Sequence, residues 1–521
     1  MPDFLTIYAT MQPDKLALID DRPDGTVLKF TFAELERQAN RLAHVLVGLG
    51  ASKGTKVVWC GQNSVGLVVA IHACRKIGTT AVPLNYRLSD DEATYVTDHC
   101  DADIVYVDAE FAPMFERIRS SLPKVRHYVV FDAAAAVAPE GMLAVEPMIA
   151  AASDLAPEIV AAETASATMI YTSGTTGKPK GALRSAGNDP SQGAALVALI
   201  GYTSDDVYLP TGPLYHSGPG GFMVVGAALG QTVVLQRKFN PEDWLRIVDK
   251  YKVSSTFSAP TPIRMICALP SEIKAKYDRS SMKRMIANAA PWSFALKQQY
   301  LAEFPHDSLW EVYGSTELGV NCVMPPLDQL RKPGSCGVAA PLVDIVLFDD
   351  DGNEVVGIGP DHPGELFVRA ASVFTEYYKQ PEKYMADRRG EFQTVGDIAY
   401  RDDEGFFYIC DRKKDMVISG GMNIYPAEIE AALEQHPKIL EAAVFGVPSD
   451  EWGESVHAIV VCRDGETMTE GDVVDHARAA LANYKIPRTV SFLAELPKTG
   501  SGKILKRELR EPYWAGRASR V

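Results

Sequence analysis

Short β-branched runs alternate with helical patterns through the first four-fifths of this chain, and this alternation restricts the fold more than any other feature. Residues 56–61 (KVVWCG) predict a buried strand, residues 64–78 a helix, and residues 79–85 (TTAVPLN) the next strand. Residues 102–108 (ADIVYVD) continue the pattern. Strands that alternate with helices form parallel sheets covered by helices. The sequence therefore predicts an α/β fold.

A second, shorter alternation begins near Lys438. Residues 439–447 and 457–465 predict strands and residues 470–484 a helix, which together indicate a small α+β domain. The stretch before it, residues 396–437, is rich in charge and glycine, as expected of an exposed hinge. Because 521 residues are too many for one core, we expect at least two domains.

Composition disfavours several classes of function. The formal net charge of −15 argues against a nucleic-acid partner, whose affinity comes largely from lysine and arginine. The eight cysteines form no CxxC pair and no zinc-spaced cluster, so we expect free thiols in a reducing cytosol and a cytoplasmic protein. We see no signal peptide, and no apolar run approaches the length of a membrane span.

Residues 171–182 (YTSGTTGKPKGA) form the most informative stretch. Glycines let a backbone approach an anion closely, and successive N–H groups form a concave site for it. The stretch adds hydroxyl donors at Ser173, Thr175 and Thr176 and positive charge from two lysines. Phosphate is the expected ligand.

This stretch is not a Walker A loop, which needs G-x-x-x-x-G-K-[ST] with the last hydroxyl on magnesium. Here Gly174 and Gly177 are too close together, and Pro179 follows the lysine. A solvated turn is the alternative interpretation, but two lysines interleaved with seven small or hydroxyl residues disfavour it.

Four further stretches carry groups suited to a nucleotide. An aromatic ring can stack on a base, and a carboxylate can hold a metal ion or sugar hydroxyls. The groups are Tyr313, Thr316 and Glu317 in VYGSTELG, Asp397 after Gly396, Arg412 in DRKKD, and Lys503 in LPKTGSGKILKREL.

These five stretches, in this order, resemble the adenylate-forming superfamily of acyl-CoA synthetases, peptide-synthetase adenylation domains and luciferases. The resemblance covers nearly the whole chain. It implies ATP, Mg²⁺ and coenzyme A: a carboxylate attacks the α-phosphate of ATP, giving an acyl-adenylate and pyrophosphate, and a thiol then displaces AMP. The carboxylate is already ionised at neutral pH, so positive charge and a metal should supply most of the barrier lowering.

The resemblance also implies residue roles in ATP and AMP binding. Residues 172–180 would wrap the β- and γ-phosphates, and Tyr313 would stack on adenine beside the 288–291 (NAAP) slot. Asp397 and Arg412 would hold the ribose. The implied nucleotide-binding residues are Thr172, Ser173, Gly174, Thr175, Thr176, Gly177, Lys178, Lys180, Asn288, Ala289, Ala290, Tyr313, Gly314, Asp397 and Arg412.

Catalytic roles follow in the same way. Thr316 would touch the α-phosphate, Glu317 would hold Mg²⁺, and Lys503 would bridge the carboxylate and the α-phosphate. For the second half-reaction, the family rotates its small domain about a hinge residue, which here is Lys414. We therefore expect a large domain over residues 1–411 and a small mobile domain over residues 412–521.

After that rotation, the resemblance places a backbone segment against the tunnel for coenzyme A. The segment is Ser419, Gly420 and Gly421, and Gly421 would let the backbone approach closely. The gate of the tunnel would be Tyr215 and His216 in PLYHSGP.

The acyl pocket, by resemblance, is lined from residues 215–230, 258–262 and 314–322, with Tyr215, Phe222, Met223 and Gly319 among its residues. These linings are small and apolar and offer no arginine or lysine for a second carboxylate. We expect an apolar monocarboxylic acid, first a medium- or long-chain fatty acid. An aryl acid and a steroid or bile-acid-type side-chain acid are the alternatives.

The acceptor is expected to be free coenzyme A. His216 stands where peptide-synthetase domains carry an aspartate, and the chain stops soon after KREL with no carrier domain. An acyl-AMP ligase that loads a carrier protein, and a non-catalytic homologue, are the rival classes. The first usually carries an insertion that this chain lacks, and the second would have lost Lys503 or Glu317.

One departure from the family pattern concerns Arg184 and Ser185, which stand where many relatives carry a histidine. We further expect a homodimer with no integral membrane segment; peripheral membrane contact is left open.

Overall fold

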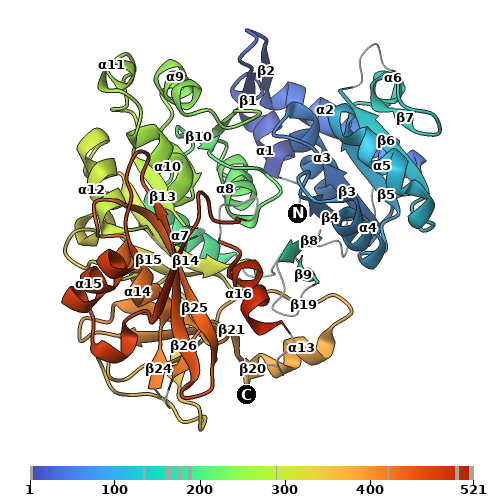
Figure 1. Cartoon of the computed structure of the whole chain (residues 1–521). Helices are drawn as coiled ribbons and strands as arrows, with labels where there is room; N and C mark the ends of the chain where they lie inside the picture. Colours follow the sequence, from blue (N-terminus) through green and yellow to red (C-terminus); the bar gives the residue numbers. More distant parts are fainter. Residues whose placement is uncertain are drawn as a thin grey trace.

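The computed structural model describes residues 4–132, 137–158, 167–172, 178–185, 190–288, 290, 292–419, 422–498 and 504–515. Two large sheets lie side by side in the N-terminal part, and a smaller domain follows at the C-terminal end of the chain (Figure 1). The predicted α/β class is confirmed. Among the described residues, no helix is long and apolar enough to cross a membrane.

The first large sheet has eight strands in the order β19-β9-β8-β4-β3-β5-β6-β7. Its strands are β3 (Lys56–Cys60), β4 (Thr80–Leu84), β5 (Ile104–Asp108), β6 (His127–Phe131), β7 (Leu143–Ala144), β8 (Ala167–Thr172), β9 (Lys180–Ser185) and β19 (Glu376–Tyr377). The strands from β8 to β7 pair in parallel, whereas β9 pairs antiparallel with both of its neighbours.

Alternate side chains of this sheet serve two different cores. Val57 and Trp59 of β3 pack with one core cluster and Val58 and Cys60 with another, since successive residues of a strand point to opposite faces. Helices therefore cover both faces. They are α2 (Phe32–Gly48), α3 (Val65–Lys76), α4 (Asp90–His99), α5 (Ala112–Ile118) and α6 (Val145–Ala151).

The second large sheet has nine strands in the order β16-β15-β14-β13-β12-β10-β11-β1-β2. Its strands are β1 (Leu16–Asp21), β2 (Val27–Thr31), β10 (Val207–Pro210), β11 (Thr232–Leu235), β12 (Ser255–Ser258), β13 (Arg284–Ala287), β14 (Leu309–Ser315), β15 (Gly319–Met324) and β16 (Val338–Ala339). Its helices are α1 (Phe4–Met11), α7 (Ser191–Ile200), α8 (Ser217–Ala228), α9 (Pro241–Tyr251), α10 (Pro260–Cys267), α11 (Ser271–Lys274) and α12 (Phe294–Glu303).

The two large sheets share one core. Leu18 of β1 and Val233 of β11 belong to the same buried cluster as Val57 and Trp59 of the first sheet. Their neighbours Ile19 and Val234 point to a separate core with α9, α10 and α12. The facing surfaces of the two sheets are thus held together by apolar side chains.

Two smaller sheets complete the chain. The third sheet comprises β17 (Asp344–Phe348), β18 (Gly364–Arg369), β20 (Arg388–Arg389), β21 (Phe392–Arg401) and β22 (Phe407–Arg412), with α13 (Pro381–Ala386) nearby in sequence. The C-terminal sheet comprises β23 (Val417–Ser419), β24 (Met422–Ile424), β25 (Ile439–Ser449), β26 (Gly453–Cys462) and β27 (Thr489–Phe492). Its helices are α14 (Pro426–Leu433), α15 (Glu470–Ala480) and α16 (Lys506–Trp514), and it has its own cores.

A buried ion pair links α12 to β14 behind the strand that leads into the candidate site. Lys297 and Glu311 form a salt bridge in which only 3% and 10% of the two side chains are exposed. Burial raises the pKa of Glu311, and the nearby Lys297 charge partly offsets that effect.

We predict that Lys297→Met destabilises the protein by about 3 kcal/mol or more, because it leaves a carboxyl group buried without its cation. Replacing both residues by methionine should recover most of the loss. Urea unfolding would measure this. Arg117→Met, which breaks an exposed pair with Asp90, is the control and should cost under about 1 kcal/mol; equal losses in the two single variants would contradict the prediction.

Candidate active site

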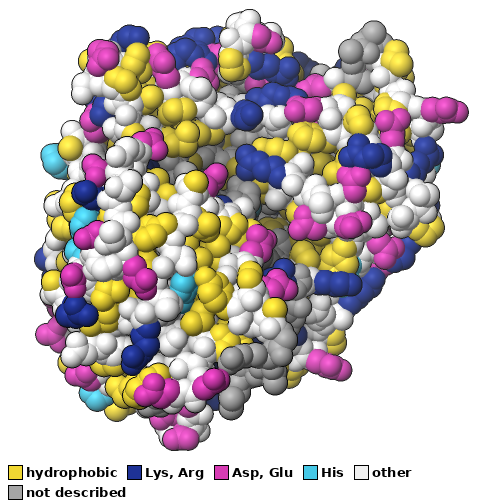
Figure 2. All heavy atoms as spheres, in the orientation of Figure 1, with side chains coloured by type: hydrophobic (Ala, Val, Ile, Leu, Met, Phe, Trp, Pro, Cys, Tyr) yellow, Lys and Arg dark blue, Asp and Glu magenta, His cyan; other side chains and the backbone are white. Residues whose placement is uncertain are grey.

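A large cleft of about 3910 Å³ runs between the two large sheets and the C-terminal domain. Figure 2 shows this face of the molecule hollowed between these parts. Pockets for one small molecule usually measure about 300–1,000 Å³. A cleft of this size can hold several ligands at once.

The carboxylate of Glu317 lies at the wall of this cleft, in the turn between β14 and β15. The hydroxyl groups of Thr172 and Tyr377 both donate to its Oε1, at 2.9 and 3.1 Å. Its neighbour Thr316 shares a hydrogen bond of 2.9 Å between its Oγ1 and the Oγ of Ser217. Hydroxyl groups from three other segments, β8, β19 and α8, therefore meet at this turn.

Two glycines make this turn tight. A Cβ on Gly314 would lie 1.9 Å from the carbonyl oxygen of Gly319. Gly319 has φ +76°, a conformation that favours glycine. Any side chain at either position would push Thr316 and Glu317 out of place.

The two lysines of the predicted phosphate segment have different surroundings. Lys180 is only 5% exposed, and its Nζ lies 5.3 Å from the centre of the Tyr377 ring. Burial, together with the nearby charge of Lys383, lowers the pKa of Lys180. Lys178 is exposed, with its Nζ 5.1 Å from the ring of Tyr95. Lys180 is thus the lysine near Glu317.

The predicted nucleotide residues Tyr313, Asp397 and Arg412 lie together. The Tyr313 hydroxyl donates to Asp397 Oδ2 at 2.5 Å, and Arg412 Nε lies 3.2 Å from Asp397 Oδ1. Asp397 and Arg412 are directly opposite each other in the β21–β22 pair. Burial and the Asp397 charge raise the pKa of Tyr313 well above its ordinary value, so the hydroxyl stays protonated and can donate.

Asn288 lies next to this group, at the end of β13. Its side-chain Nδ2 donates to the carbonyl of Val312, and its backbone N–H donates to the carbonyl of Ser258 at 3.1 Å. Asn288 and Ala290 both line the cleft, as does Gly314. The predicted adenine slot is therefore beside Tyr313.

Aromatic side chains line another part of the cleft. The rings of Tyr215 and His216 are 4.4 Å apart, and Tyr86 meets Tyr215 edge-on at 5.6 Å. The rings of Phe222 and Phe257 are 5.4 Å apart. Four of these side chains line the cleft, and Tyr86 packs against one of them, Tyr215.

Comparison with known proteins accounts for this arrangement. The sequence profile of the AMP-binding enzyme family matches residues 5–378, and that of the AMP-binding enzyme C-terminal domain matches residues 428–503. The chain belongs to the AMP-binding, adenylate-forming enzymes. The predicted family is thereby confirmed, and with it the activity class of AMP-forming acyl-CoA synthetases, which use ATP, coenzyme A and a small carboxylic acid.

Relatives of this adenylate-forming enzyme act on different acids. Indoleacetate–CoA ligase of Aromatoleum aromaticum is 33% identical over 98% of each chain. The long-chain fatty-acid–CoA ligase FadD13 of Mycobacterium tuberculosis is 32% identical over 97% of each chain. ATP-bound MatB of Rhodopseudomonas palustris is similar in structure, with a TM-score of 0.84 and 30% identity over 99% of each chain.

Several predicted residues fall outside the described part of this adenylate-forming enzyme. They are Ser173, Gly174, Thr175, Thr176, Gly177, Ala289, Pro291, Gly420, Gly421 and Lys503. On either side of the last stretch, Lys498 and Ile504 both line the cleft. Lys414 lines it too, and burial lowers its pKa. Ser419 lies in the β23–β24 hairpin and is not a cleft residue.

The acyl-pocket prediction needs two corrections. Met223 is 1% exposed, lies in the shared core and does not line the cleft. Two glycines of α8 that line the cleft serve close packing, whereas a Cβ on Gly221 would meet no atom within 4 Å. A Cβ on Gly218 would lie 2.2 Å from the Phe257 ring, and one on Gly220 would lie 2.4 Å from the Leu214 carbonyl oxygen.

Some groups that meet the Glu317 turn are not predicted from the sequence. Tyr377 belongs to none of the motifs. The only signal in the sequence is the pair of adjacent tyrosines in EYYK, residues 376–379. Ser217 directly follows His216, so a hydroxyl there could have been recognised. Arg184, which the sequence marks only as a departure from the family pattern, lines the cleft.

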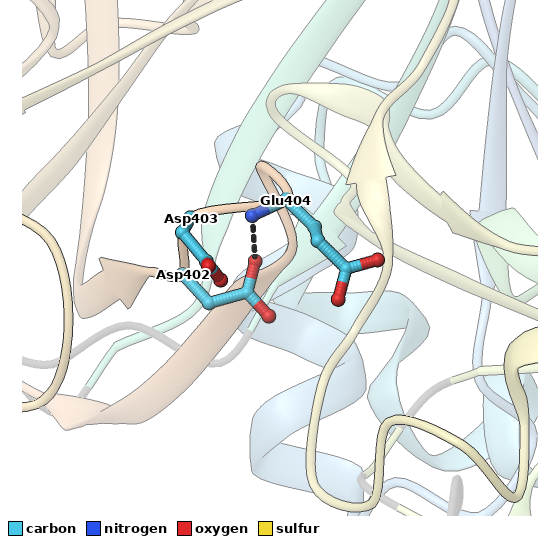
Figure 3. Close-up of side chains that lie close together, drawn as sticks. All are labelled: Asp402, Asp403 and Glu404. Atoms are coloured by element: carbon cyan, nitrogen blue, oxygen red, sulfur yellow. Dashed lines mark hydrogen bonds between the residues drawn. The ribbon is translucent and has the colours of Figure 1, made fainter.

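Three acids of the β21–β22 turn, Asp402, Asp403 and Glu404, come close enough to share a metal ion (Figure 3). However, the Asp402 carboxylate accepts the Glu404 N–H at 3.0 Å, and Lys332 pairs with both acids at 2.7 and 2.5 Å. The cluster is thus explained by turn geometry and ion pairs at an exposed position.

We predict that Asp397→Ala weakens AMP binding by about 10- to 100-fold, because hydrogen bonds to charged groups contribute about 1.5–3 kcal/mol. Isothermal titration calorimetry with AMP would measure the loss. Asp403→Ala removes an exposed carboxylate from the turn of the same hairpin and is the control. Equal affinities for the two variants would show that Asp397 does not hold the nucleotide.

Proposed function

We propose that this enzyme converts an apolar monocarboxylic acid to its acyl-adenylate and then to a coenzyme A thioester, releasing pyrophosphate and AMP. The observation that carries the proposal is the group at the β14–β15 turn. There a buried carboxylate, four hydroxyl groups and a buried lysine meet beside the predicted nucleotide residues.

Each group of the turn has a task in the first half-reaction, which brings an anion against a polyanion. Lys180 supplies positive charge near the phosphates, and Thr316 offers a hydroxyl to the α-phosphate. Preorganised charge of this kind is commonly the largest contribution to lowering such a barrier. Lys503, between two residues that line the cleft, is the proposed cation that bridges the carboxylate and the α-phosphate.

Glu317 fits the expected Mg²⁺. Mg²⁺ commonly binds through one or two carboxylates together with substrate phosphates. Both hydroxyl donors reach Oε1 of Glu317 and so orient the carboxylate, and its Oε2 is the proposed metal ligand. Bound Mg²⁺ would neutralise charge on the transferring phosphates. A cytoplasmic location and a homodimer stay predictions.

The acid that fits best carries an aromatic ring. Phe222, Phe257 and Tyr215 all line the cleft, the rings of Phe222 and Phe257 are paired, and aromatic pairs gain about 0.5–1.5 kcal/mol beyond burial. Relatives named for indoleacetate, ferulate, 2-succinylbenzoate and anthranilate support this choice. It places the aryl acid before the fatty acid first expected from the sequence.

A fatty acid is the second candidate because an aliphatic wall is also present. Ile71, Leu196, Val197, Ile200 and Val224 line the same cleft. Each methylene buried there would contribute about 0.8 kcal/mol at best. A relative that acts on long-chain fatty acids supports this candidate.

We predict that Phe222→Leu lowers kcat/KM for indole-3-acetate by about 3- to 10-fold, the loss of one aromatic pair, and changes that for octanoate less than twofold. Pyrophosphate release measures both. Met223→Leu, a volume-conserving change at the adjacent core position, should leave kcat/KM for both acids unchanged. Equal losses for the two acids would favour the fatty-acid candidate, and acetate or malonate as the best substrate would refute the apolar pocket.

For the second half-reaction we propose the rotation of a small domain about Lys414, close to the predicted boundary between residues 1–411 and 412–521. The β21–β22 hairpin ends at Arg412, and the separate C-terminal sheet begins at Val417. Rotation about Lys414 would withdraw the loop of Lys503 and bring residues 419–421 to the cleft. Tyr215 and His216 are the proposed gate for the thiol.

We predict opposite defects for two variants. Lys414→Pro should still release pyrophosphate but form no thioester, because proline fixes φ near −65° and obstructs rotation. Lys503→Ala should fail the first step, yet convert supplied acyl-adenylate and coenzyme A to thioester. Separate assays of the two half-reactions would measure this, with Lys413→Ala as a control beside the hinge. The same defect in both variants would refute the rotation.

A further inference from the structure

Arg184 joins two distant segments at the Glu317 turn. It lies on β9, and its guanidinium donates from Nη1 to the carbonyl of Thr316 and from Nη2 to the carbonyl of Ser372 at 2.7 Å. The planar guanidinium carries several donors in fixed directions, so one side chain can hold two carbonyls at once.

Ser372 in turn connects the turn to α7. Its backbone N–H donates to Gln192 Oε1 at 2.9 Å, and its Oγ accepts from Gln192 Nε2 at 3.1 Å. The same hydroxyl donates to the carbonyl of Leu318 at 3.0 Å. Arg184, Gln192 and Ser372 therefore form one polar cluster against the turn.

Three consecutive backbone carbonyls of the turn are held in this way. The carbonyl of Thr316 accepts from Arg184, that of Glu317 accepts from the Phe374 N–H at 2.7 Å, and that of Leu318 accepts from Ser372. A Cβ on Gly319 would lie 2.5 Å from Ser372 Oγ, so the segments are in close contact. The backbone of Thr316 and Glu317 cannot shift without breaking these bonds.

The cluster serves the protein rather than the substrate. Both polar atoms of the Gln192 amide, and both the N–H and the hydroxyl of Ser372, are engaged with other protein groups. A polar substituent of the substrate would have to break these bonds, and leaving a buried polar group without its partner costs about 1–3 kcal/mol. This argues against a receptor for a polar acyl group.

The charge of Arg184 also bears on the turn. Burial lowers the pKa of Arg184, and the Glu317 carboxylate opposes that effect. Arginine nevertheless keeps its proton in proteins. A permanent cation therefore lies within electrostatic reach of the carboxylate that would hold Mg²⁺.

We infer that Arg184 is a positioning residue for the adenylation step: with Ser372 and Gln192 it fixes the backbone of the turn so that Thr316 and Glu317 face the α-phosphate and its metal. The inference rests on the proposed function. It assigns Arg184 a role that acts through Thr316 and Glu317, without contact to the reacting atoms.

The test compares Arg184→Met, Arg184→Lys and Ser372→Ala with wild-type enzyme. For Arg184→Met we expect kcat for pyrophosphate release to fall about 30- to 100-fold, with KM for ATP within threefold and a higher Mg²⁺ concentration for half-maximal rate. Conversion of supplied acyl-adenylate to thioester should stay within threefold. Arg184→Lys should recover part of the rate because an ammonium can still donate to one carbonyl.

Ser372→Ala keeps its backbone carbonyl for Arg184 but loses the hydrogen bond to the Leu318 carbonyl. It should therefore lower kcat for pyrophosphate release by about 3- to 10-fold, again with KM for ATP within threefold. Arg117→Met, an exposed arginine on α5, is the control and should match wild type. Equal losses in both half-reactions, a change confined to KM, or no loss would overturn the inference. If Arg184→Met does not fold, Arg184→Lys and Ser372→Ala decide by the same criteria.

Failure of the proposed function gives a different result. In that case the wild-type enzyme releases no pyrophosphate with indole-3-acetate, octanoate, acetate or malonate. The inference about Arg184 fails only when the wild type is active and the variants lack the expected split between kcat and KM.

Discussion

One carboxylate oxygen joins the two large sheets at the cleft. Oε1 of Glu317, in the turn of the nine-stranded sheet, accepts hydroxyl groups from Thr172 of β8 and Tyr377 of β19 in the eight-stranded sheet. A buried carboxylate is costly unless it is paired and hydrogen-bonded. The nearby cations Lys180 and Arg184 supply opposite charge, so these polar contacts add to the shared apolar core in holding the sheets together at the cleft.

The sequence predicted those features that depend on neighbouring residues. Strand and helix alternation placed the strands at residues 56–61, 79–85 and 102–108, because the pattern of burial repeats locally. The motif order predicted the family. It also brought Tyr313, Asp397 and Arg412 to one place, which the structure shows as one hydrogen-bonded group.

Other features could not be read from the sequence because they depend on contacts between distant residues. Arg184 meets carbonyls that lie 132 and 188 residues away, and no local pattern marks those partners. The glycines of α8 are a second example. They line the cleft as expected, but no local pattern shows that Gly218 and Gly220 are required by the close approach of Phe257 and the Leu214 carbonyl.

The nucleotide residues and the proposed hinge are coupled by geometry. Asp397 and Arg412 face each other across the β21–β22 pair, and the next residue, Lys413, donates its N–H to the Gly396 carbonyl at 2.8 Å. The Lys413 Nζ also pairs with Glu365 at 3.1 Å, on the same sheet. The chain is thus anchored to the third sheet up to Lys413. The proposed rotation of the C-terminal body would therefore take place after that anchor, and Asp397 and Arg412 would keep their pairing during it.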